Sequence, residues 1–214
     1  MKKILLLVIS ALIVTSCSHK DEPFPKPLPT PAIQIVTMTE SGHNKISWTN
    51  EDAIQFQFIN IYKEEELNVF KLLASTSAAN CSYDDPESDG FKPQRYYITG
   101  IKADSIESSA STIHKTIHLD VRKTGGGYLL TWNKYEGLPI LSYVIVRGAE
   151  KWPVAPIDYI PSSDTCYTDL TPNEQEPYYA ILYSTPATNK IKSTAPPPDT
   201  YYGLSNVVDI RNLK

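Results

Sequence analysis

An approximate repeat, offset by 84 residues, runs through this sequence. Three short motifs of the first half recur at that offset in the second half. The pairs are Ile46-Ser47-Trp48 with Leu130-Thr131-Trp132, Ile59-Asn60-Ile61 with Tyr143-Val144-Ile145, and Tyr83-Asp84-Asp85 with Tyr167-Thr168-Asp169. The chain of 214 residues is therefore predicted to hold two copies of one module. A module of about 90 residues buries only about 60–65% of its unfolded surface, which allows a compact core but no deep internal cavity.

Residues 1–16 have the pattern of a lipoprotein signal peptide. Lys2-Lys3 precedes an apolar run from Ile4 to Val14, which suits a signal-peptide core and is well short of the ~20 residues that span a bilayer. The following Thr15-Ser16-Cys17 completes a motif that resembles the bacterial lipobox, which implies cleavage before Cys17 and lipidation of its thiol. Because acyl chains contribute ~0.8 kcal/mol per buried CH₂, two or more of them hold a protein on a membrane. The alternative is an ordinary signal peptide that happens to carry a cysteine.

Residues 17–31 are predicted to form a tether behind the lipidated Cys17. Ser18-His19-Lys20-Asp21-Glu22 resembles the acidic tag that sends some Gram-negative lipoproteins to the outer face of the outer membrane, and a merely polar spacer is the alternative. From Pro23 to Pro31 every second residue is proline, so we expect a polyproline II segment of roughly 30 Å. The predicted location is the outer membrane, with the protein on the cell surface.

Acidic residues outnumber basic ones in this chain. The formal net charge is −4, and it becomes −6 when residues 1–16 and their two lysines are removed. No segment concentrates Lys and Arg, so nucleic acid is excluded as a predicted partner.

Each copy of the repeat consists of short alternating runs with turn residues between them, a pattern typical of an all-β sandwich. Because successive side chains of a strand point to opposite faces, Ile46 and Trp48 are expected on one buried face. Leu130 and Trp132 are expected to do the same in the second copy.

The order of these motifs resembles that of the fibronectin type III family over about residues 32–213. The second copy shows it best, with strand B at Leu130–Trp132, C at Tyr143–Gly148, E at Cys166–Asp169, F at Tyr179–Ile181 and G opening at Gly203. The resemblance implies two tandem immunoglobulin-like β-sandwiches of seven strands, at residues 32–118 and 119–214. It also implies no catalytic chemistry, because this family mostly binds proteins or glycans through loops or spaces other domains.

Cys81 and Cys166 occupy nearly equivalent places in the two copies. A disulfide needs Cα atoms within about 7 Å, and tandem modules hold equivalent points much further apart. We therefore predict two separate reduced thiols that are buried as small apolar residues, with intermolecular pairing as the alternative.

No catalytic, metal or cofactor site is predicted. His114 and His118 are expected on one extended strand, where four residues separate the imidazoles by about 13 Å, too far to share a zinc ion. The segment from Asp85 to Gly90 has acidic residues at alternate positions, but Tyr96 stands where a calcium loop needs its bidentate Glu. We interpret it as a solvated acidic corner, with a looser calcium site as the alternative. The chain is predicted not to be an enzyme; a hydrolase with an unrecognised site is the alternative.

Ligand binding is predicted at the loops of the second copy. Ser184 to Gly203 is longer than an ordinary connection, and such loops are usually functional or disordered. Together with the B–C loop it is expected to gather Tyr135, Tyr201 and Tyr202, whose rings suit a sugar or a protein surface. The alternative is that these tyrosines pack on the sandwich. Trp152 is interpreted either as an exposed anchor for the ligand or as a cover for the hinge between modules or for an edge strand.

These features predict an outer-membrane lipoprotein that binds a glycan or a protein through the loops of tandem β-sandwiches. The membrane, through Cys17, is its other predicted partner. The alternative is a structural subunit of a cell-envelope assembly that uses the edges and faces of its modules and has no small ligand.

Overall fold

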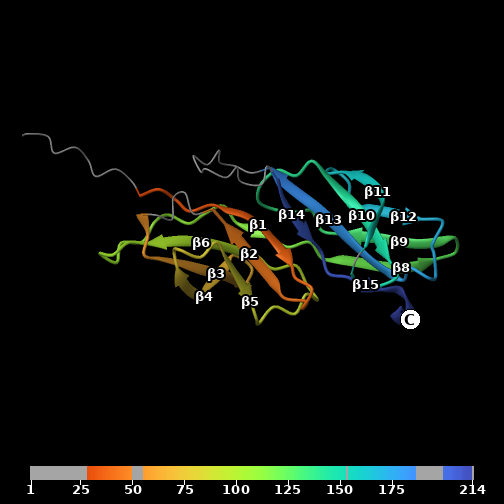
Figure 1. Cartoon of the computed structure of the whole chain (residues 1–214), viewed down its shortest axis with the longest axis horizontal. Helices are drawn as coiled ribbons and strands as arrows, with labels where there is room; N and C mark the ends of the chain where they lie inside the picture. Colours follow the sequence, from red (N-terminus) through yellow and green to blue (C-terminus); the bar gives the residue numbers. More distant parts are fainter. Residues whose placement is uncertain (1–27, 50–54, 153, 187–199, 214) are drawn as a thin grey trace, which may run out of the picture.

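The computed structural model describes residues 28–49, 55–152, 154–186 and 200–213. The described residues form four sheets, two in each half of the chain, so the predicted all-β fold of two tandem sandwiches is confirmed. Figure 1 shows the two sandwiches following one another along the long axis of the molecule. Cys17 and the predicted signal peptide lie outside the described residues.

The first module packs a three-stranded sheet, β1-β2-β5, on a four-stranded sheet, β4-β3-β6-β7. All neighbouring strands are antiparallel. This is the seven-stranded arrangement that the family resemblance implied. The strands are β1 (Ile33–Met38), β2 (Asn44–Trp48), β3 (Phe58–Glu66), β4 (Val69–Ser77), β5 (Ser82–Asp85), β6 (Arg95–Ile101) and β7 (His114–Lys115).

The second module repeats this plan with the sheets β12-β9-β8 and β11-β10-β13-β14. Its last strand is broken, because the chain leaves β13 after Leu204 and pairs with it again as β15. The elements are β8 (Leu119–Thr124), β9 (Gly127–Trp132), β10 (Ser142–Gly148), β11 (Ala155–Pro161), β12 (Cys166–Asp169), β13 (Tyr178–Pro186), β14 (Thr200–Leu204), β15 (Val208–Asp209) and the 3-10 turn η2 (Ile210–Asn212).

In both modules every second side chain of a core strand points into the space between the two sheets, and these side chains form the core. Ile46 and Trp48 of β2 are buried in the first module, and Leu130 and Trp132 of β9 are buried in the second, as predicted. In the second core the Trp132 indole meets the ring of Tyr143 edge to face, with 5.4 Å between ring centroids. Aromatic pairs of this geometry add about 0.5–1.5 kcal/mol to the stability that burial provides.

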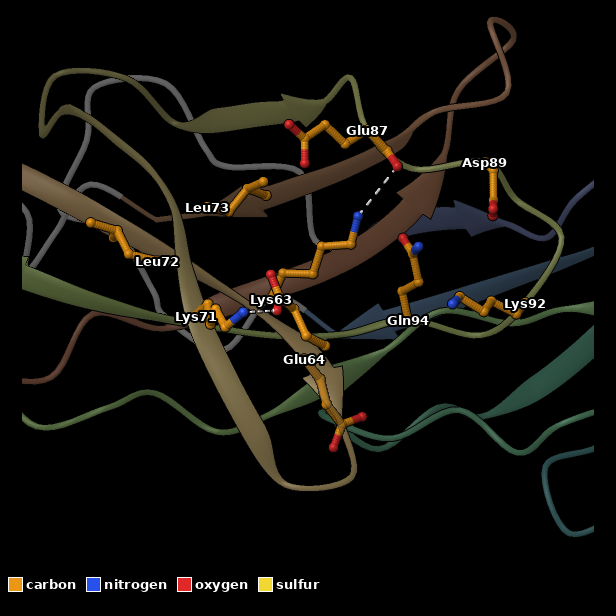
Figure 2. Close-up of a pocket in the computed structure, with 10 residues that line it drawn as sticks. Lys63, Glu64, Lys71, Leu72, Leu73, Glu87, Asp89, Lys92 and Gln94 are labelled. Atoms are coloured by element: carbon orange, nitrogen blue, oxygen red, sulfur yellow. Dashed lines mark hydrogen bonds and ion pairs between the residues drawn. The ribbon is translucent and has the colours of Figure 1, made fainter.

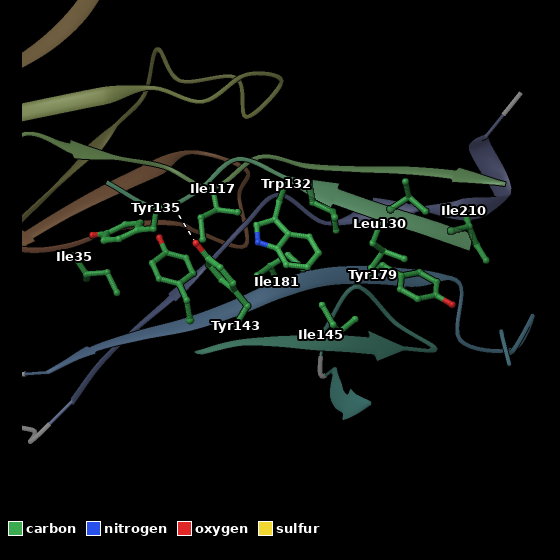
Figure 3. Close-up of a cluster of buried hydrophobic side chains, with 13 residues drawn as sticks. Ile35, Ile117, Leu130, Trp132, Tyr135, Tyr143, Ile145, Tyr179, Ile181 and Ile210 are labelled. Atoms are coloured by element: carbon green, nitrogen blue, oxygen red, sulfur yellow. Dashed lines mark hydrogen bonds between the residues drawn. The ribbon is translucent and has the colours of Figure 1, made fainter. Parts of the chain in front are cut away.

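The first strand, β1, belongs to both modules. Val36 packs in the core of the first module, whereas Ile35 packs in the core of the second. Figure 3 shows Ile35 beside Tyr135 at one end of the second cluster, with Ile210 at the other end. A β-bulge between Ile33 and Ile35 shifts the register at this place, which is how bulges re-aim side chains.

Hydrogen bonds join β1 to the last strands of the second module. The Tyr183 hydroxyl donates to the Val36 carbonyl, and the Thr185 hydroxyl donates to the Gln34 carbonyl at 2.9 Å. The Leu204 amide donates to the Thr37 hydroxyl at 2.8 Å. The modules therefore share a buried, hydrogen-bonded seam along β1.

Two asparagine side chains hold the connection between the modules. Asn133 accepts from the His118 amide at 2.8 Å and donates to the Thr116 carbonyl at 2.9 Å. Asn206 accepts from the Leu119 amide at 2.6 Å and donates to its carbonyl at 2.9 Å. Both residues come from the second module, so the connection is bound to that module on two sides.

Candidate functional site

Tyr135 is predicted to face a ligand, and the structure corrects this. Its ring is only 6% exposed and lies in the core cluster of the second module, 4.9 Å from the ring of Tyr183. Its hydroxyl shares a 2.7 Å hydrogen bond with Nδ1 of His114 in the first module. The B–C loop of the second module faces the first module, so its tyrosine closes the seam between the two.

Tyr201 and Tyr202 lie in strand β14 rather than in a loop. Tyr201 is half-buried and packs against the core cluster of the second module. Tyr202 points the other way and is 66% exposed. The predicted meeting of Tyr135, Tyr201 and Tyr202 as one exposed aromatic set is therefore wrong, since two of the three pack inward. The middle of the predicted loop, residues 187–199, lies outside the described residues.

Trp152 fits both of its interpretations in part. It packs on a small apolar cluster on the outer face of the second module, formed by Val146, Ala180 and Leu204. It also lines a hollow to which the first module contributes. Trp152 thus lies at the boundary between modules, as Tyr135 does, and it is the predicted site residue that lines a hollow there.

This hollow, which we call the inter-module groove, has a volume of about 210 Å³. The first module lines it with the β1–β2 hairpin and the β5–β6 loop, and the second module lines it with the β10–β11 loop and the residues after β14. Its lining residues are Met38, Thr39, Glu40, Gly42, Asp89, Gly90, Phe91, Lys151, Trp152, Asn206 and Val207.

Phe91 gives the groove an exposed aromatic wall. Its side chain is 82% exposed, although large apolar side chains are usually covered. Its loop is ordered by local bonds, because the Phe91 amide donates to the Asp89 carboxylate at 3.0 Å and the Gly90 carbonyl lies 3.0 Å from Nδ1 of His118. Phe91 is not among the site residues predicted from the sequence, where its signal is no more than an apolar ring directly after a Gly turn.

A second, larger hollow of about 390 Å³ lies in the first module beside β3, β4 and the β5–β6 loop (Figure 2). Its walls are mainly charged, and several of the charges already satisfy one another. Lys71 pairs with Glu65, while the Lys63 ammonium lies 3.4 Å from the Glu87 carbonyl and 2.9 Å from the Asp85 carboxylate. This cleft lacks the aromatic wall of the groove, so the groove is the stronger candidate site.

Each module contains the same buried cation–carboxylate–tyrosine triad. In the first, Asp85 binds Lys63 and accepts from the Tyr96 hydroxyl at 2.8 Å. In the second, Asp169 binds Arg147 at 2.7 Å and accepts from the Tyr179 hydroxyl at 2.6 Å. Asp85 is fully buried, which corrects its interpretation as part of a solvated corner; Glu87 and Asp89 of that segment are exposed.

Hydrogen bonds and a neighbouring cation keep the buried carboxyl of Asp169 ionised. Burial alone would raise the pKa of this carboxyl, but hydrogen bonds from Tyr179 and the Thr171 amide and the charge of Arg147 lower it below the ordinary value. Asp169 is therefore ionised at neutral pH and forms a structural ion pair.

His114 and His118 do not come together as ligands of one metal ion. The predicted strand is shorter than expected, since β7 covers only His114–Lys115. His114 is fully buried against Tyr135, and His118 turns to the β5–β6 loop. Within the described residues no group of three or more His, Cys, Asp and Glu side chains is arranged to hold a metal.

Cys81 and Cys166 are free thiols, as expected, but both are exposed, so their predicted burial is wrong. In β12 the neighbours Tyr167 and Asp169 face inward, and Cys166 therefore faces out.

No protein-family model and no curated protein matches the chain. Solved structures that resemble it include a two-domain fibronectin type III segment of chicken tenascin, with 13% identity, a TM-score of 0.33, and coverage of 84% of this chain and 97% of that one. A chicken interferon gamma receptor alpha chain matches at 10% identity and a TM-score of 0.31, over 85% of this chain and 95% of that one. The central fibronectin-III array of RIM-binding protein matches at 10% identity and a TM-score of 0.31, over 84% and 70%. At these identities the similarity concerns the fold alone.

No helix among the described residues is long and apolar enough to cross a membrane.

Proposed function

We propose that this chain is a non-enzymatic lipoprotein, anchored in the outer membrane through Cys17 and displayed on the cell surface, that binds a glycan or protein partner in the inter-module groove. The observation that carries the proposal is the exposed ring of Phe91 in a groove that Trp152 also lines, on loops that different modules supply. Binding residues are commonly placed on loops that a sandwich scaffold positions. The groove replaces the predicted loop cluster around Tyr135.

Site-specific photo-crosslinking in the native cell envelope tests this proposal. A photoreactive amino acid in place of Phe91 is expected to yield a discrete adduct, whereas the same group in place of Tyr159 is expected to yield none. Tyr159 is the matched control, because it is an exposed aromatic of β11 that does not line the groove. Adducts of equal yield at both positions, or an adduct only from position 202 of β14, would contradict the groove as the binding site.

The anchor is tested separately by Cys17→Ser. Loss of the lipid-bearing thiol is expected to move the protein from the membrane pellet to the soluble fraction, because no acyl chain then holds it. Fractionation followed by immunoblotting measures this. Cys81→Ser is the matched control, since Cys81 is an exposed thiol of the first module and should leave the protein in the pellet. Retention in the pellet of Cys17→Ser protein from which residues 1–16 have been removed would rule out the lipid anchor, whereas an uncleaved apolar run from Ile4 to Val14 can itself hold the chain on a membrane.

A structural subunit is the second candidate, and the exposed edge strands favour it. Within the described part of the chain β4 and β11 each pair on one side only, and β4 presents the exposed side chains of Val69 and Leu72. Unprotected edges of this kind pair readily with another chain. In that case Leu72→Lys would abolish incorporation into the assembly, while Phe91→Ala would leave it intact.

A further inference from the structure

The chemistry of the inter-module groove narrows the class of ligand. With a volume of about 210 Å³, the groove is smaller than the ~300–1,000 Å³ pockets that enclose drug-sized ligands. It therefore accommodates one ring-sized group, and the rest of a larger ligand extends along the surface. Figure 1 shows β1 and β14 running close to one another where the two modules meet.

The aromatic side chains favour a ligand with an apolar face. Phe91 is exposed on one side of the groove, and Trp152 from the other module lines it as well. Covering these rings is favourable, because apolar surface is removed from water. The C–H faces of a pyranose ring present such a surface.

The polar groups at the groove favour a ligand whose groups both donate and accept hydrogen bonds. Glu40 and Asp89 supply carboxylates, which only accept, while Lys151 supplies an ammonium, which only donates. Thr39 adds a hydroxyl, although this already donates to the His43 carbonyl at 2.9 Å. Sugar hydroxyls satisfy acceptors and donors alike.

The charges at the groove disfavour an anionic ligand, because two carboxylates outnumber one ammonium. An anionic sugar, such as a uronic acid, would meet the carboxylates of Glu40 and Asp89. A cationic side chain of a partner protein would meet the same two carboxylates as well as the ammonium of Lys151, so the oligolysine probe below has to separate it from a neutral sugar. Like charges in a partly desolvated site repel, and this repulsion is a source of specificity.

We infer that the inter-module groove binds a neutral sugar residue of a glycan, stacked on Phe91 and Trp152 and hydrogen-bonded to Glu40, Asp89 and Lys151. This inference rests on the groove being the binding site proposed above.

Tryptophan fluorescence of the full chain provides a selective test. The chain has three tryptophans, and Trp48 and Trp132 are buried in the cores, so a ligand in the groove reaches only Trp152. We expect a saturable change of emission with at least one of a panel of short neutral gluco-, galacto-, manno- and xylo-oligosaccharides. An oligouronate and an oligolysine serve as charged probes and are expected to give none.

Variants assign that signal to the groove. Trp152→Phe is expected to remove the fluorescence change, and Phe91→Ala is expected to weaken apparent affinity by about tenfold or more, as for an aromatic anchor. Tyr159→Ala, the control outside the groove, is expected to bind normally, and unchanged circular dichroism and melting temperature show that each variant is folded.

Two results would overturn the inference: no saturable change with any neutral sugar, or a preference for a charged probe. If photo-crosslinking at position 91 still yields a discrete protein adduct, the groove remains a binding site and only the sugar assignment fails. If that adduct is missing as well, the proposed function fails with it.

Discussion

Asp169→Ala is expected to lower the free energy of unfolding of the second module by about 3–5 kcal/mol, the usual cost of removing one partner of a buried ion pair. The Asp169 side chain is 2% exposed and binds Arg147, Tyr179 and the Thr171 amide. Its loss leaves the Tyr179 hydroxyl without its acceptor and takes from Arg147 the buried carboxylate, so that Arg147 keeps only Glu176 at the rim and the Thr171 carbonyl. Urea unfolding followed by circular dichroism measures the change.

Two controls distinguish the loss of this ion pair from the effect that removing any acidic residue has on the free energy of unfolding. Glu150→Ala removes an exposed carboxylate of the same module and is expected to change stability by less than about 0.5 kcal/mol. The double variant Arg147→Met with Asp169→Ala is expected to cost less than the sum of the single variants, because no unpaired charge remains. A loss below about 1 kcal/mol for Asp169→Ala would show that the triad is not a stabilising element.

Acidification from pH 6.5 to pH 5 is expected to lower the free energy of unfolding by about 1.5 kcal/mol through His114 alone. Burial between the modules lowers the pKa of His114 from 6.5 to about 4. Below pH 6.5 the unfolded chain therefore binds a proton that the folded chain does not bind. The stability that neutral His114 provides is complete above pH 6.5 and is lost progressively as the pH falls toward 4.

Melting temperatures across this pH range measure the effect, and His114→Phe is expected to flatten the slope while keeping a ring at the seam. His118→Gln is the matched control, because His118 lies half-buried four residues along the chain. The ion pair of Asp169 does not add to this pH dependence. Its carboxyl has a pKa lowered from the ordinary value of 3.8, so the stability that it provides is lost only below pH 3.8. A proton NMR titration in which the His114 ring shifts with a midpoint near 6.5 would contradict the prediction.

Most of the fold follows from the sequence because strand alternation is a local property. Trp48 and Trp132 lie in β2 and β9 and face the cores, as their spacing in the repeat predicts. The same offset of 84 residues also relates Lys63 to Arg147 and Asp85 to Asp169, so both partners of each buried ion pair stand at matching places in the repeat. Their burial does not follow from the repeat, because an acidic turn and a buried carboxylate look alike in sequence.

The site is harder to predict because it depends on how the two modules meet. Tyr135 stands in a loop with turn-like sequence, and nothing in its neighbourhood indicates that His114 of the other module covers it. Phe91 and Trp152 are 61 positions apart and belong to different modules, so no repeat or spacing brings them together. The predicted burial of Cys166 fails for a simpler reason, since adjacent residues of a strand face opposite ways and Tyr167 takes the inward position.

The double membership of β1 has a mechanical consequence. β1 is the first strand among the described residues, and Ile35 and Val36 enter the two cores from opposite faces. Tension applied at the N-terminus therefore loads both sandwiches at once, and peeling β1 away would uncover two interiors in a single event. Resistance to such a pull is a property of the unfolding rate rather than of equilibrium stability, and we expect the detachment of β1 to govern that rate for both modules together.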